Sequence, residues 1–122
     1  MVDWEPISLI ALLERIKQGC ARMTETQRHL WQGVQIKPEK WKQHPYGDAG
    51  DGFWVVGLVG RTVIWYNDLE NGFNRSVYSD YGVIDDYWRN ADELELTIQY
   101  LANALAGGHD LSLIGSGFKK RA

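Results

Sequence analysis

Residues 53–79 read FWVVGLVGRTVIWYNDLENGFNRSVYS, and this stretch decides the fold. It contains three apolar runs, Phe53–Val59, Thr62–Glu70 and Phe73–Ser79, which are separated by Gly60-Arg61 and Asn71-Gly72. Glycine at the first position of a two-residue loop favours a type II′ turn, and Asn-Gly favours a type I′ turn. We therefore predict a meander of three antiparallel strands joined by two tight turns.

The two turns also predict a register for the strands. The expected cross-strand pairs are Val59–Thr62, Leu58–Val63, Val56–Trp65 and Val55–Tyr66 in the first hairpin, and Asp68–Arg75, Tyr66–Val77 and Trp65–Tyr78 in the second. Opposite charges and aromatic or β-branched partners each contribute roughly 0.2–1 kcal/mol across a pair of strands. All these pairs are favourable in the register that the two turns set, which supports the meander.

Pleating sends alternate residues to opposite faces of a sheet. One predicted face is aliphatic and includes Gly57, which allows close packing, so we expect helices to cover it. The other face carries Trp54 and Trp65 among tyrosine and asparagine residues, a composition typical of recognition surfaces. We expect this indole face to remain partly uncovered. The alternative is that the chain's own helices and loops bury both faces.

Two helices are predicted before the meander. Residues Pro6–Gln18 have the apolar spacing of an amphipathic helix, and Gly19 is expected to end it. Thr24 and Gln27 have the spacing of a capping box, which predicts a second helix over Glu25–Gln32.

A third helix is predicted over Asn90–Ala106, with Asn90 as its N-cap and Glu93 in its first turn. Alternating apolar and polar residues predict an extended segment over Val34–Lys42. Pro38 has no N–H to donate to a neighbouring strand, so we expect an edge strand or an extended arm. A brief strand is expected at Gly82–Ile84. The predicted fold class is α+β, with an N-terminal helix or helical hairpin, an antiparallel sheet of three to five strands, and a C-terminal helix packed on one sheet face.

The chain has 122 residues, the size of one ordinary domain. We expect a single α+β domain over residues 1–108 and a loosely ordered tail over residues 109–122. A single cysteine, Cys20, excludes an intramolecular disulfide. The N-terminal sequence has neither the basic region of a signal peptide nor an apolar run long enough to span a membrane. We therefore expect a soluble cytoplasmic protein.

No motif in the chain specifies a catalytic, metal or cofactor site. The Asp- and Gly-rich stretches Asp48–Gly52 and Asp68–Gly72 do not match an EF-hand loop, and turn formation explains both. The three histidines are scattered, and no Gly-rich loop has the spacing of a dinucleotide site or P-loop. A small enzyme or ligand-binding domain with a cleft near His44–Asp51 is kept as an alternative.

Charge is distributed unevenly along the chain. The segment Trp65–Leu96 contains eight acids and two bases, so it carries −6, and the net charge of −3 leaves +3 for the remainder. This distribution disfavours binding of nucleic acid by the C-terminal half, which would need an electropositive surface. It is compatible with a basic protein partner.

The segment Trp65–Trp88 interleaves tryptophan and tyrosine with acids and amides. Aromatic side chains supply buried anchors at interfaces, and acids steer a basic partner and raise the association rate. The predicted partner-binding residues are Trp54, Trp65, Tyr78, Tyr81, Tyr87 and Trp88 as anchors, with Asp80, Asp85 and Asp86 as steering charges. The alternative is that the aromatic residues fill the core of the sheet and the acids solvate its rim.

In size and in the acidic-aromatic character of Trp65–Trp88, the chain resembles small bacterial immunity proteins. These proteins neutralise the toxin domains of contact-dependent and other polymorphic toxin systems, usually by covering a basic active site. The resemblance implies a cytoplasmic bacterial inhibitor of a basic toxin domain, and it assigns no role to an individual residue. A bacterial adaptor, or a homodimer that hides its tryptophan-bearing face, has the same features.

Overall fold

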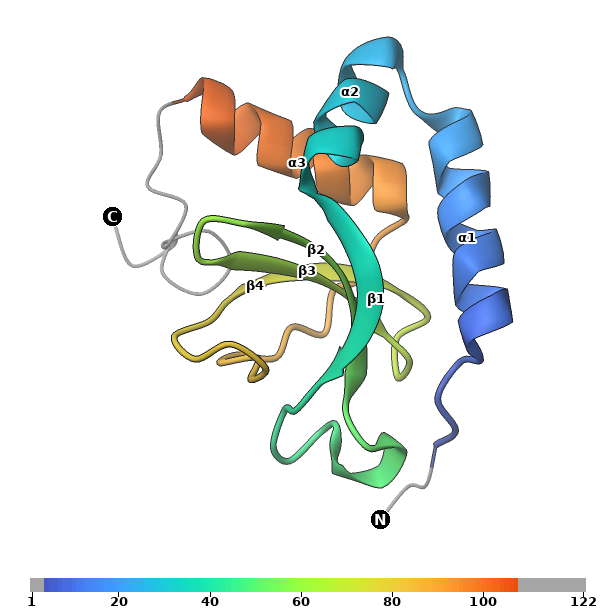
Figure 1. Cartoon of the computed structure of the whole chain (residues 1–122), viewed down its shortest axis with the longest axis vertical. Coiled ribbons are helices and arrows are strands. Elements are labelled where there is room, and N and C mark those ends of the chain that lie inside the picture. The colour runs from blue at the N-terminus through green and yellow to red at the C-terminus, as the bar shows by residue number, and fades with distance from the viewer. Residues whose placement is uncertain (1–3, 108–122) are drawn as a thin grey trace.

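The computed structural model describes residues 4–107 and has the predicted α+β architecture (Figure 1). Its elements are α1 (Leu9–Arg22), α2 (Glu25–Val34), β1 (Gln35–Trp41), a short 3₁₀ helix η1 (Asp48–Gly50), β2 (Phe53–Val59), β3 (Thr62–Asn67), β4 (Gly72–Val77) and α3 (Leu94–Ala106). The four strands form one antiparallel sheet in the order β1-β2-β3-β4. The edge strand and the three-strand meander predicted from the sequence are confirmed.

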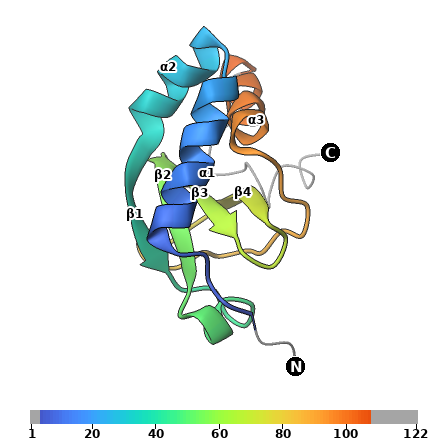
Figure 2. The ribbon, with the colours of Figure 1, turned by 90° about the vertical axis from the view of Figure 1, so that its right-hand side faces the viewer.

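The helices gather on one face of the sheet. In Figure 1 the sheet lies below α2 and α3 and beside α1, and Figure 2 shows α1 in front of the strands. The apolar residues between these layers form the helix-side core. Its largest buried members are Leu12, Met23, Trp31, Val34, Val56, Ile64, Tyr66, Phe73, Leu94, Ile98 and Leu101. The prediction that helices cover one face of the sheet is confirmed.

The opposite face of the sheet is covered by irregular chain instead of helix. Residues 78–92, which we call the covering segment, run along this face between β4 and α3 (Figure 1). Beneath it lies the loop-side core, whose buried residues are Trp41, Phe53, Val55, Val63, Trp65 and Ile84. The N-terminal segment adds Trp4, whose ring stacks on Phe53 with centroids 5.3 Å apart. Both faces of the sheet are therefore covered.

A β-bulge in β2 changes the predicted faces. The first hairpin pairs Val59 with Thr62 and Leu58 with Val63 as expected, but Val55 then pairs with Trp65. Val56 is the extra residue, and a bulge of this kind reverses the direction of the side chains that precede it. The predicted Val56–Trp65 and Val55–Tyr66 pairs are therefore wrong. Trp54 lies on the helix side and Trp65 on the loop side.

The second hairpin has a longer loop than Asn71-Gly72 predicts. Asn67 pairs with Gly72 across four loop residues, and Ile64 pairs with Arg75, so the predicted Asp68–Arg75, Tyr66–Val77 and Trp65–Tyr78 pairs are wrong. The Asn67 side chain accepts a hydrogen bond from the Leu69 N–H at 3.0 Å, which starts the turn early.

Gly72 is required for packing rather than for the turn. A Cβ at Gly72 would lie 2.7 Å from the Cβ of Ala91, too close for two carbon atoms. The absence of this side chain lets residues 91 and 92 approach the edge of β4.

The boundaries of α1 and α2 follow their caps. Ser8 caps α1 through a bond from the Ala11 N–H, and the Thr24–Gln27 capping box of α2 is present as predicted. Gly19 does not end α1, which continues to Arg22. A Cβ at Gly19 would lie 2.9 Å from the Cβ of Leu94, so this glycine allows α3 to pack closely against α1.

The third helix begins later than the sequence predicts. It starts at Leu94 with Glu93 as N-cap, instead of at Asn90. Residues before it are held in extended conformation because Phe73 and Asp92 exchange two backbone hydrogen bonds, of 2.7 and 3.0 Å. Pairing with the sheet edge replaces the first turn expected from local propensity.

No helix formed by residues 4–107 has both the length and the apolar character needed to cross a membrane.

Candidate protein-recognition surface

The covering segment is held to the sheet by backbone hydrogen bonds at both sheet edges. Beside β1, the Lys42 N–H donates to the Gly82 carbonyl at 2.9 Å and the Ile84 N–H donates to the Lys42 carbonyl at 2.8 Å. Instead of the brief strand predicted at Gly82–Ile84, the structure has an isolated parallel bridge between Lys42 and Val83. Beside β4, the Asp85 N–H donates to the Val77 carbonyl at 3.2 Å. Buried Ile84 lies between these attachments, so the surface presented by the segment is ordered before any partner arrives.

Trp65 and Trp54 do not form an uncovered indole face. Trp65 is 0% exposed, and its indole N–H donates to the Ser76 hydroxyl at 2.9 Å. Trp54 is half-buried on the other face, where its indole N–H donates to the Ile7 carbonyl at 3.0 Å and the Lys40 ammonium lies over its ring. The expectation that these two tryptophans share a partly uncovered face is therefore wrong. The covering segment buries one, and the N-terminal segment packs on the other.

Three further aromatic residues of the predicted set are half-buried and have structural partners. The Tyr78 ring packs edge-on against Trp41, and its hydroxyl donates to the Gly60 carbonyl at 3.1 Å. The Tyr87 ring stacks on Tyr46, with centroids 4.0 Å apart. The main-chain carbonyl of Trp88 accepts bonds from two buried side-chain amides, those of Asn67 and Asn74. These residues help to hold the covering segment in place.

Tyr81 differs from the other aromatic residues because most of its side chain faces solvent. It is 65% exposed, although its ring contacts buried Trp41 at a centroid distance of 4.7 Å. The Tyr81 hydroxyl donates to the Glu39 carboxylate, which also accepts the Trp41 indole N–H at 2.8 Å. Tyr81 is thus an exposed aromatic ring whose orientation is set from both ends. Val83, 39% exposed, extends the apolar area on the same segment.

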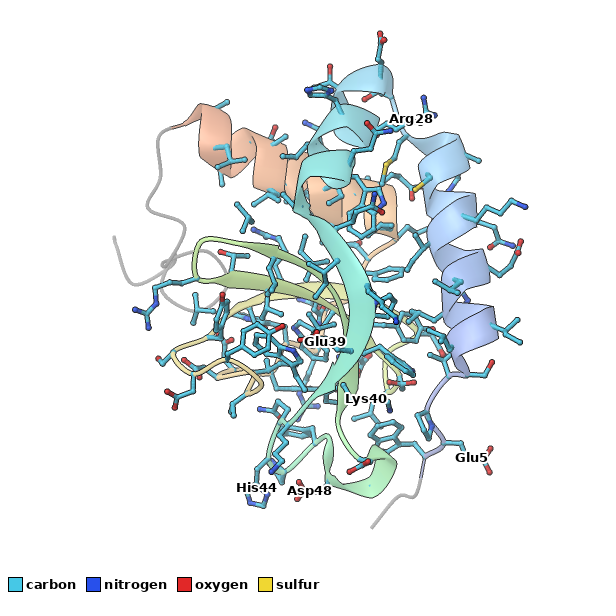
Figure 3. The ribbon with its side chains drawn as sticks, viewed as in Figure 1. Glu5, Arg28, Glu39, Lys40, His44 and Asp48 are labelled. Carbon is cyan, nitrogen blue, oxygen red and sulfur yellow. The ribbon has the colours of Figure 1, made fainter. Side chains whose placement is uncertain are left out.

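Glu39 is a charged member of this surface. The hydrogen bonds from Tyr81 and Trp41 hold the pKa of the Glu39 carboxyl below its ordinary value, so it is ionised at neutral pH. The same bond raises the pKa of the Tyr81 hydroxyl, which keeps it protonated as a donor. Figure 3 labels Glu39 on β1, beside Lys40.

The three predicted steering acids have different environments. Asp80 and Asp85 are exposed, and Asp85 accepts a hydrogen bond from the Ser79 hydroxyl at 2.9 Å. Asp86 is partly buried and accepts the Trp88 indole N–H at 3.2 Å, so its carboxylate is directed into the structure. Asp85 and Tyr78 also line a shallow hollow of about 260 Å³ with Arg61. We define the recognition surface as Glu39, Asp80, Tyr81, Val83 and Asp85.

Part of the negative charge of the segment Trp65–Leu96 is compensated by contacts within the fold. Arg22 forms ion pairs with Glu93 at 2.9 Å and with Glu95 at 2.7 Å. Asp68 is turned inward and accepts the Ile7 N–H at 2.6 Å. The acids that remain for steering on the covering segment are chiefly Asp80 and Asp85.

The loop near His44–Asp51 forms a compact turn. His44 and Asp48 approach to 2.7 Å on its outer side (Figure 3), and both side chains are largely exposed. On the inner side, the Lys40 ammonium donates to the carbonyls of Gly50 and Gly52 at 3.0 and 3.3 Å. Across residues 4–107, no three or more His, Cys, Asp or Glu side chains gather as a metal site would require.

Sequence reasoning missed the contribution of β1 to this surface. Glu39 and Tyr81 are 42 positions apart, and only the pairing of Lys42 with Val83 brings them together. The prediction of an extended segment over Val34–Lys42 located β1, but not the segment that packs over the Trp41 indole ring.

Comparisons with protein-family models, with curated protein sequences and with solved structures found no match to this chain.

Proposed function

We propose that this chain is a protein-binding module of the immunity type, which inhibits a basic toxin domain by occluding it. The observation that carries the proposal is Tyr81, an exposed ring held in one orientation by Trp41 and Glu39. Interface hot spots are enriched in tyrosine, and an anchor that is ordered beforehand loses little conformational entropy on binding.

The charges around Tyr81 favour a basic partner. Glu39, Asp80 and Asp85 are carboxylates on or beside the covering segment, and the last two are exposed. Lys42 lies across the bridge from Val83, and Arg61 lines the same hollow as Asp85. Cationic side chains of a partner would be attracted to Asp80 and Asp85, and this attraction raises the association rate. Occlusion of an active site requires only this binding, and no chemistry by the inhibitor.

The direct test uses the protein encoded immediately upstream of this chain as the probe. We expect it to be a toxin domain that binds this chain and loses activity when bound. Tyr81→Ala is expected to weaken binding by about 2 kcal/mol, which is roughly 30-fold. Tyr100→Ala, which removes an exposed tyrosine from α3, is the matched control and should bind as the wild type does. Unchanged affinity of Tyr81→Ala for a partner that does bind would remove this surface from the proposal.

The steering role has a separate kinetic test. The double variant Asp80→Asn, Asp85→Asn should associate more slowly with the same partner and show a shallower dependence of the association rate on salt. Glu14→Gln with Glu25→Gln removes two exposed acids from the helices and serves as the control. Equal salt dependence in the two double variants would contradict electrostatic steering by the covering segment. A metabolic enzyme upstream, with no effect of this chain on it, would remove the support for an immunity role.

A further inference from the structure

A second opening lies at the other edge of the sheet, between β4, residues 88–92 and α3. Its volume is about 230 Å³, and its lining includes Asn74, Arg75, Trp88, Asp92 and Tyr100. At about 30 Å³ per water molecule this space corresponds to roughly eight waters. It is smaller than the ~300–1,000 Å³ typical of drug-sized ligand sites, so any ligand must be small.

The opening follows from how the covering segment contacts β4. Asp92 pairs with Phe73 through two backbone bonds, and the Asp85 N–H donates to Val77. Arg75 lies midway between these two attachments, and within residues 4–107 no backbone bond from the covering segment reaches it. The chain leaves the strand edge opposite Arg75, and the pocket occupies that gap.

Arg75 brings a poorly compensated positive charge into the pocket. Its side chain is partly buried, with the guanidinium 5.6 Å from the centre of the Tyr100 ring. In the part of the chain that the structure describes, no carboxylate lies within 4 Å of it. Burial lowers the pKa of the Arg75 guanidinium, while Tyr100 and Asp92 act in the opposite direction. Arginine nevertheless stays protonated in proteins, and its planar fork matches a carboxylate in two parallel hydrogen bonds.

Asp92 supplies the opposite charge. It lines the same pocket, and its carboxylate is not within 4 Å of the Arg75 guanidinium. The pocket thus brings together a cation and a separate anion.

We propose that this pocket binds a small zwitterion of the α-amino-acid class. Arg75 binds the ligand carboxylate, Asp92 receives its ammonium group, and Trp88 and Tyr100 flank its side chain. A phosphate dianion is disfavoured because a single guanidinium faces it and the Asp92 carboxylate repels it. The site is separate from the recognition surface, because none of the five residues that define that surface is among the described residues that line the pocket.

Isothermal titration calorimetry with single compounds tests the proposal. The probes are glycine, L-leucine and L-phenylalanine, with acetate, methylamine and inorganic phosphate as comparators. We expect at least one amino acid to bind the full chain with a millimolar or lower Kd, and more tightly than any comparator. Failure of all three amino acids to bind at about ten times that concentration would overturn the proposal. So would acetate or phosphate binding as tightly as the amino acids.

Three variants assign the roles. Arg75→Gln should weaken amino-acid binding at least ten-fold, since a loss of 1.4 kcal/mol corresponds to that factor. Asp92→Asn keeps the backbone pair with Phe73, and it should weaken amino-acid binding while strengthening acetate binding. Arg61→Gln, an exposed arginine outside the pocket, is the control. Equal affinity of Asp92→Asn and wild type for the amino acid would overturn the ammonium contact. Thermal unfolding of each variant confirms that it is folded.

Discussion

At the scale of single residues, Asp68 connects the N-terminal segment to the loop between β3 and β4. Its carboxylate accepts the Ile7 N–H, and its second oxygen is buried without a donor. Burial raises the pKa of the Asp68 carboxyl, against the opposing effects of the Ile7 N–H and the Lys40 ammonium. The charged form of Asp68 is therefore less favourable in the folded chain than in water.

This shift predicts a pH dependence of stability. Because the folded pKa of Asp68 lies above its unfolded value of about 3.9, its contribution to stability is fully present below that pH. The contribution is lost as pH rises through the folded pKa. Asp68→Asn removes this loss. Relative to wild type, the variant should therefore be more stable at about pH 7 than at about pH 3. Urea denaturation at the two pH values measures this difference in the free energy of unfolding.

Glu70→Gln is the matched control, because it removes one carboxylate from the same loop at an exposed position. The contrast between the two variants isolates the effect of burial. The raised pKa would be contradicted if the stability of Asp68→Asn relative to wild type were the same at both pH values. It would also be contradicted if this relative stability fell towards neutral pH.

At the scale of elements, two glycines inside helices have opposite reasons to be present. Gly19 in α1 faces the Cβ of Leu94, whereas nothing lies within 4 Å of the position that a Cβ would take at Gly33 in α2. Alanine is favoured over glycine in a helix interior by about 0.8–1.0 kcal/mol. Only Gly33 can gain from this preference without displacing a neighbour.

We therefore expect Gly33→Ala to raise the free energy of unfolding by up to about 1 kcal/mol. Gly19→Ala should lower it by roughly 1–3 kcal/mol, because the new methyl group forces α1 and α3 apart. Chemical denaturation of both variants measures the contrast. Stabilisation by both substitutions would show that α1 and α3 do not pack as closely as described.

Element types were predictable because local chemistry decides them. The Thr24–Gln27 capping box and the alternating apolar runs are visible in the sequence, and they gave α2 and the strands. The errors arose where distant residues compete with local preference. The pairing of Asp92 with Phe73 delays α3, and the burial of Asp68 against Ile7 belongs to the longer second hairpin. The bulge at Val56 has no local signal beyond the adjacent glycine.

At the scale of the whole molecule, two cores share one sheet, and the loop-side core depends on irregular chain. Ile84 of the covering segment is 2% exposed beside Trp41 and Trp65. A segment that supplies a buried residue to a core unfolds together with that core. The covering segment is thus an integral layer of the fold and not an appended loop.

Ile84→Ala should accordingly lower the global free energy of unfolding by about 2–5 kcal/mol. Unfolding monitored by tryptophan fluorescence and by far-UV circular dichroism should give coincident transitions. Val83→Ala, an exposed neighbour on the same segment, is the control and should change stability by less than about 0.5 kcal/mol. A selective change in fluorescence without a shift of the far-UV transition would mean that the segment detaches on its own.

The same long-range packing limited prediction of the candidate site. The acidic and aromatic character of Trp65–Trp88 is evident from the sequence, but exposure depends on which residues the covering segment turns inward. Tyr81 is largely exposed while Trp65 is sealed, and both belong to one alternation of aromatic residues and acids. Glu39 enters only through tertiary structure.

The attachment of residues 85 and 92 to β4 also affects how the chain behaves among its own copies. Strand addition, as in fibrils, requires a continuous row of vacant main-chain donors and acceptors along a sheet edge. On β4, Phe73 and Val77 are already occupied at two points by the chain itself, on either side of Arg75. Between these two points, an incoming strand could pair only with the main-chain N–H and C=O of Arg75. Concentrated solutions of this protein should therefore resist growth of intermolecular β-structure from that edge.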